Sequence, residues 1–64
     1  MKVYPYQFEV GDVLSTGFGA AKLVSKEEDD SEGREIWIVR YVDLDIEMEH
    51  GFVDTEYIVL EVAE

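Results

Sequence analysis

The feature that most constrains this chain is its division into five short apolar stretches, none of which has the spacing of a long amphipathic helix. Turn-forming residues separate the stretches, as at Val10-Gly11-Asp12 and at 17–19 (Gly-Phe-Gly). Short apolar stretches divided in this way are typical of a small all-β domain. We therefore expect five antiparallel strands that close into a small barrel, because closure removes the strand edges that a flat sheet of this size leaves unprotected.

The expected strands follow from β-branched and aromatic composition and from period-two alternation. In chain order they span 12–15, 20–26, 35–42, about 44–49 and 58–62. Acidic and apolar residues alternate over 43–49, so we expect a turn near Asp43 and then a short strand. The alternatives are one long bent strand that continues to the His50-Gly51 turn, or a partly ordered acidic loop over 43–50. Asp54 has the position of an N-cap, which predicts one helical turn over 54–57 before the last strand.

The 64 residues are enough for one domain, which we place at 1–64. Residues 1–7 contain Pro5 and are expected to form a sheet edge or an irregular arm. Residues 26–33 carry five acids and are expected to be a mobile, dispensable hairpin tip. The expected core consists of inward-facing apolar residues, with one of each adjacent pair buried: Val13, Leu23, Ile36 or Trp37, Ile38 or Val39, Val53, Ile58 and Leu60.

Sixteen acidic residues against five basic ones give the chain a formal net charge of −11. This charge repels phosphate backbones and anionic lipid surfaces, which argues against nucleic-acid or membrane binding and favours a protein partner with a basic surface. The chain has no cysteine, so disulfides and thiol chemistry are excluded. No apolar run approaches the roughly 18 residues of a membrane span, and no signal peptide is evident, so the expected location is cytoplasmic.

No combination of side chains has the pattern of a catalytic or metal site. His50 is the only imidazole, and we expect it to be a solvent-exposed turn residue. The alternative is a weak pH sensor whose pKa the neighbouring carboxylates raise. Asp43, Asp45 and Glu47 have the spacing that opens a calcium-binding loop. Such a loop needs glycine at the position that Met48 occupies. We therefore expect no enzymatic activity, no metal and no cofactor.

Aromatic and acidic side chains are the remaining candidates for a contact surface. Tyr4, Tyr6 and Phe18 fall at an expected edge or in a turn, where an aromatic ring is open to a partner. Trp37 lies in mid-strand, where burial in the core is the competing expectation. An aromatic surface ringed by carboxylates suits a Lys-rich or Arg-rich peptide. The candidate partner-binding residues are Tyr4, Tyr6, Phe18, Trp37, Tyr41, Asp45, Glu47 and Glu49.

Two parts of the sequence resemble one known family. The first is the run 8–14 (Phe-Glu-Val-Gly-Asp-Val-Leu) with the glycine turn and apolar strand of 17–24, and the second is the strand 37–41 (Trp-Ile-Val-Arg-Tyr). Over about residues 8–62 the chain resembles the CarD-like RNA polymerase-interacting domain, which also occurs in the bacterial transcription-repair coupling factor. The resemblance implies an SH3-like or Tudor-like barrel and RNA polymerase as the partner. The acids of 45–49 depart from the family, which often has basic or neutral residues there.

These observations support two functions. The leading hypothesis is a non-enzymatic protein-interaction module that binds RNA polymerase or another transcription-associated protein by strand augmentation, with aromatic and acidic side chains selecting the partner. The alternative is an acidic decoy that mimics nucleic acid and inhibits a basic DNA-binding protein. It is based on the net charge and on the period-two acids of 43–49, which on a strand are separated by about 6.6 Å.

Overall fold

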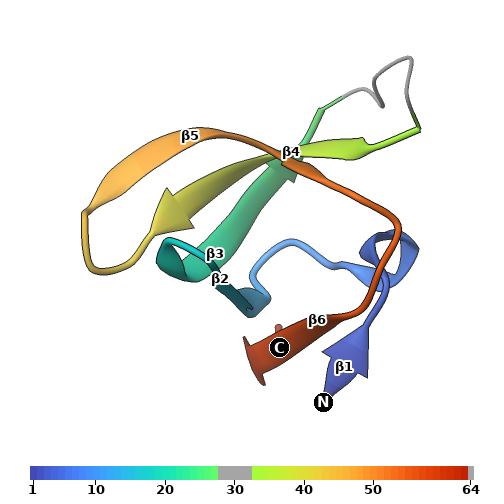
Figure 1. Ribbon diagram of the computed structural model, residues 1–64. Helices are drawn as coiled ribbons and strands as arrows, with labels where there is room; N and C mark the ends of the chain where they lie inside the picture. The colour runs from blue at the N-terminus through green and yellow to red at the C-terminus, as the bar shows by residue number, and fades with distance from the viewer. Residues whose placement is uncertain (28–32, 64) are drawn as a thin grey trace.

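The chain folds into one antiparallel sheet, which confirms the prediction of an all-β fold. The computed structural model describes residues 1–27 and 33–63 and places six strands in the order β1-β6-β2-β3-β4-β5 (Figure 1). The elements are β1 (Lys2–Val3), the 3-10 turn η1 (Pro5–Gln7), β2 (Val13–Thr16), β3 (Gly19–Lys26), β4 (Glu35–Tyr41), β5 (Ile46–Phe52) and β6 (Tyr57–Glu61). The sheet is open, with β1 and β5 at its ends, and it has six strands rather than the five expected.

Most of the expected local features are present. Residues 1–7 form both an end strand of the sheet and the turn η1. The turn near Asp43 is confirmed, and the strand β5 follows it. Gly19 closes the tight β2–β3 turn with a φ of 104°, a conformation that only glycine adopts without strain. Residues 28–32 of the expected hairpin tip lie outside the described residues.

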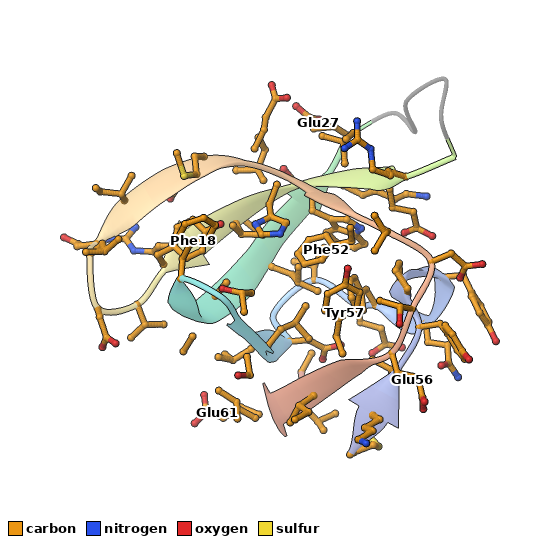
Figure 2. All side chains as sticks on the ribbon, viewed as in Figure 1. Phe18, Glu27, Phe52, Glu56, Tyr57 and Glu61 are labelled. Atoms are coloured by element: carbon orange, nitrogen blue, oxygen red, sulfur yellow. The ribbon has the colours of Figure 1, made fainter. Side chains whose placement is uncertain are left out.

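The core lies where the long strands β3, β4 and β5 arch over β6 and β1 (Figure 1). It consists of Phe8, Leu14, Ala21, Leu23, Trp37, Val39, Tyr41, Phe52 and Val59. Side chains alternate between the two faces of β4, and this alternation buries Trp37 and Val39 rather than their neighbours Ile36 and Ile38. Figure 2 shows Phe52 and Tyr57 next to each other in the interior, with ring centroids 5.2 Å apart.

Near β5 and β6 the buried residues differ from the expected ones by one position. The prediction was wrong for three residues, which are about half exposed: Val53, Ile58 and Leu60. Phe52 and Val59 are buried in their place. Val59 pairs with Leu14 of β2, and this register turns Val59 inward and its two neighbours outward.

The helical turn expected over 54–57 is also absent, and a bend takes its place. The Thr55 N–H donates to the Val53 carbonyl at 2.8 Å, which makes a tighter turn than a helix. Tyr57 already belongs to β6 and pairs with Val3 of β1. Sheet pairing therefore outweighs the local capping preference of Asp54.

A buried carboxylate fixes the turn before β2. Asp12 is 5% exposed, and its two oxygens accept the backbone N–H groups of Ala63 (2.7 Å) and Glu9 (3.1 Å). The Asp12 carbonyl also accepts the N–H of Leu23 at 2.8 Å. One side chain thus connects the N-terminal turn to the segment that follows β6.

Candidate functional site

Strand β5 is the longer of the two end strands of the sheet. It pairs with β4 over all seven of its residues and with no other strand of the described chain. The opposite end strand, β1, has only two residues. An end strand presents unpaired backbone N–H and C=O groups to any strand that is added beside it. β5 is therefore the edge that is long enough to accept a further strand.

Two backbone hydrogen bonds on the β3 side of β4 show which β5 residues have backbone groups at this edge. Val42, just after β4, donates its N–H to the Ala20 carbonyl at 3.0 Å. The Ile36 carbonyl accepts the N–H of Glu27 at 2.8 Å. The backbone groups of the even-numbered residues of β4 thus point toward β3, and those of its odd-numbered residues point toward β5. The odd-numbered residues of β4 stand opposite the even-numbered residues of β5. The backbone groups left on the free side, which we name the β5 edge, belong to Glu47, Glu49 and Gly51.

The side chains on the outer face of β5 are acidic. Arg40 stands opposite Glu47, with Nη1 3.2 Å from the carboxylate, and its Nη2 forms a hydrogen bond with Asp45. The hydrogen bond with Asp45 and the charge of that carboxylate raise the pKa of Arg40 above its ordinary value. No ion pair within residues 1–27 and 33–63 involves Glu49. Of the three carboxylates beside the β5 edge, two therefore share one guanidinium, and the third has no ion pair within the described residues.

The inner face of β5 carries apolar side chains that the core does not fully cover. Ile46 stands opposite Tyr41 and Met48 opposite Val39, and both β5 residues are 50% exposed. Phe18, which is 72% exposed, contacts the Tyr41 ring edge-on with centroids 5.9 Å apart. Figure 2 shows Phe18 close to the end of β4. We name the exposed side chains of Phe18, Ile46 and Met48 the inner patch.

His50 lies within β5 rather than in an exposed turn, which corrects the sequence-based expectation. Its ring stacks on Phe52 with centroids 4.3 Å apart, and its Nδ1 shares a hydrogen bond of 2.6 Å with the Tyr41 hydroxyl. Burial lowers the pKa of His50, whereas the pH-sensor alternative requires a rise, and burial raises the pKa of Tyr41. His50 is therefore neutral at neutral pH and adds no positive charge beside the acidic outer face.

The structure divides the predicted contact residues into three groups. The group on or beside β5 comprises Phe18, Asp45, Glu47 and Glu49. Trp37 and Tyr41 lie in the core, at 4% and 3% exposed. Tyr4 and Tyr6 stack 5.8 Å apart around η1, which Figure 1 shows on the opposite side of the molecule from the β2–β3 turn that carries Phe18. The predicted residues therefore do not form one continuous surface.

Sequence reasoning missed the apolar half of the β5 surface. The alternation over 43–49 predicts a half-buried strand, and Ile46 and Met48 are the apolar residues of that alternation. The core ends before it reaches them, so they are half exposed. Gly51 contributes only backbone groups, and no sequence signal identifies such a contribution.

Among the described residues, no group of three or more His, Cys, Asp or Glu side chains is arranged to hold a metal ion. The described segments contain no helix with the length and apolar character needed to cross a bilayer. Comparisons with protein-family models, curated proteins and solved structures found no match for this chain. Its functional assignment therefore depends on the geometry of β5.

Proposed function

We propose that this chain is a non-enzymatic protein-interaction module that binds an extended segment of a partner as an added strand on β5. The observation that carries the proposal is the β5 edge, where Glu47, Glu49 and Gly51 direct their backbone groups away from β4. Main-chain hydrogen bonds give such complexes their affinity, and alternate side chains give them their specificity. The inner patch and the carboxylates of the outer face supply these alternate contacts.

For the fold we propose a small SH3-like or Tudor-like barrel of five strands, β2 to β6, that is open between β5 and β6. Two observations support it. The last strand, β6, returns to pair with β2, the first strand of the meander. The rings of Phe52 and Tyr57 contact each other at the ends of the two strands that flank the opening. In this description β1 is an addition to the barrel.

For the partner we propose RNA polymerase or another transcription-associated protein with a basic surface, in the cytoplasm. The support is the resemblance of residues 8–62 to the CarD-like domain together with the net charge of −11. We propose no direct contact with nucleic acid or membrane, because both surfaces are anionic.

Replacing Glu49 with proline tests strand addition directly. The Glu49 N–H faces the free edge, so Glu49→Pro removes a donor for the added strand without removing a hydrogen bond to β4. We expect the wild-type chain, immobilised and exposed to cell extract, to capture partners that Glu49→Pro captures about ten-fold less. Mass spectrometry quantifies the captured proteins.

Glu49→Gln is the matched control, because it removes the same charge and keeps the N–H. It should reduce capture by no more than about five-fold, since exposed charges contribute little to the free energy of a complex. Both variants should unfold within about 1 kcal/mol of the wild type in urea. If capture is unchanged by Glu49→Pro, and is instead lost in Glu49→Gln and at high salt, strand addition is wrong and the acidic decoy is the better description.

A further inference from the structure

We propose that the segment bound by β5 is a two-faced strand, with lysine or arginine opposite Glu47 and Glu49 and apolar residues at the alternating positions. This inference rests on the proposed function, because it names the chemistry of the partner at the same edge. The direction of the backbone groups, the charge of the outer face and the exposure of the inner patch support it.

The backbone determines which face of the added strand meets the carboxylates. Glu47 and Glu49 direct their N–H and C=O groups to the free edge, so each would form a hydrogen-bonded pair with a residue of an antiparallel partner strand. The two residues of such a pair have Cα atoms about 5.5 Å apart and side chains on the same face of the sheet. The partner side chains opposite Glu47 and Glu49 therefore lie beside their carboxylates.

The charge on that face selects a basic side chain. Glu49 forms no ion pair within the described residues, and Glu47 shares Arg40 with Asp45. Two other cations lie on the same face. Lys22 stands opposite Arg40 on β3, one strand further from the edge, and the Arg34 side chain lies beside Gly51, near the end of β5. A lysine or arginine opposite Glu49 would gain a cross-strand ion pair, whereas an acidic residue would meet a like charge.

The inner patch selects apolar residues at the intervening positions. Partner residues between the hydrogen-bonded pairs point to the inner face, where Ile46 and Met48 are each 50% exposed. The unbranched Met48 side chain adapts its shape to different apolar neighbours. Phe18 adds an aromatic face that is 72% exposed. Apolar partner side chains would cover these groups and remove their surface from water.

The same charges argue against a second copy of this chain as the occupant. Antiparallel pairing of two β5 edges would place the carboxylates of Glu47 and Glu49 opposite one another. Like charges directly opposite each other in a sheet are destabilising, and each copy has a net charge of −11. Natural sheets use such edge charges to prevent self-pairing. A basic partner strand turns the same charges into an attraction.

The test compares capped peptides as long as β5 in which valine alternates with lysine, with glutamine or with glutamate. Titrations followed by NMR at physiological salt should show binding of the lysine peptide at the amides of the β5 edge. The glutamine peptide should bind about ten-fold more weakly, and the glutamate peptide should not bind measurably. Glu49→Lys, an exposed change that leaves the backbone intact, should reverse the preference between the lysine and glutamate peptides.

Two further probes separate the partner chemistry from strand addition itself. A peptide of the same composition, with its lysines and valines in two blocks, should bind at least about ten-fold more weakly than the alternating peptide. Equal binding of the lysine and glutamine peptides, both lost in Glu49→Pro, would overturn the charge inference and leave strand addition intact. Equal binding of the blocked and alternating peptides, unaffected by Glu49→Pro, would overturn both. The charge inference and strand addition also both fail if none of the peptides binds at millimolar concentration.

Discussion

Replacing Phe52 with alanine is expected to remove a large part of the chain's free energy of unfolding. Phe52 is fully buried, its ring is edge-on to Phe8 at 5.0 Å and to Tyr57 at 5.2 Å, and His50 stacks on it. Removing a buried phenylalanine ring costs about 3 to 5 kcal/mol. A domain of 64 residues has a total stability of about 3 to 10 kcal/mol, so the loss is comparable to the whole. Urea unfolding followed by Trp37 fluorescence measures it.

Val53→Ala is the control, because Val53 is the adjacent residue and is 50% exposed. It should lower the free energy of unfolding by no more than about 1 kcal/mol. The pair of variants tests the register of β5 as well as the size of the cavity, since a shift of one residue would exchange the two side chains between core and solvent. A larger cost for Val53→Ala than for Phe52→Ala would show that this register is wrong.

The second large effect is expected for Asp12→Ala. This change removes the acceptors of the Ala63 and Glu9 N–H groups and frees the segment after β6 from the turn before β2. Hydrogen bonds to a charged acceptor are worth more than neutral ones, so we expect a loss of about 2 to 4 kcal/mol in the free energy of unfolding. The same urea titration gives the value.

Asp43→Ala makes the same chemical change at an exposed position in the β4–β5 turn. It should leave the stability unchanged or raise it slightly, because it removes one of sixteen acidic residues from a chain with a charge of −11. If Asp12→Ala and Asp43→Ala have the same effect, the buried Asp12 hydrogen bonds do not contribute as argued.

The strands β2 to β5 are predictable because local and tertiary preferences agree there. In β4, aromatic and β-branched residues occupy every position around Arg40, and Trp37 and Val39 fall on the buried face. In β5, the alternation of acids with Ile46 and Met48 specifies a strand even without a preceding glycine or proline.

The last strand shows where the sequence pattern stops being informative. Residues 58–60 (Ile-Val-Leu) are apolar at every position, so periodicity cannot tell which face is buried. The pairing of Val59 with Leu14, a contact between distant parts of the chain, determines which face of this strand is buried. The absence of a helical turn at 54–57 has the same origin, because Tyr57 pairs with Val3.

The candidate site was predictable only in part. Exposure of Phe18 and the acids of β5 follows from turn chemistry and alternation, and the structure confirms that these residues are exposed. The burial of Tyr41 and the separate location of Tyr4 and Tyr6 depend on strand order, which the sequence pattern does not contain. The direction of the Glu49 N–H depends on the pairing of β4 with β3, two strands away from the edge.

Residue-resolved amide hydrogen exchange in the free protein reports whether the β5 edge is open to a further strand. Fast exchange at Glu47, Glu49 and Gly51, alternating with slow exchange at Met48 and His50, is the predicted result. Addition of the alternating lysine–valine peptide should slow the first three amides and leave the other two unchanged. Slow exchange at Glu47, Glu49 and Gly51 in the free protein would rule out an open β5 edge, because it would show that these backbone groups already have partners.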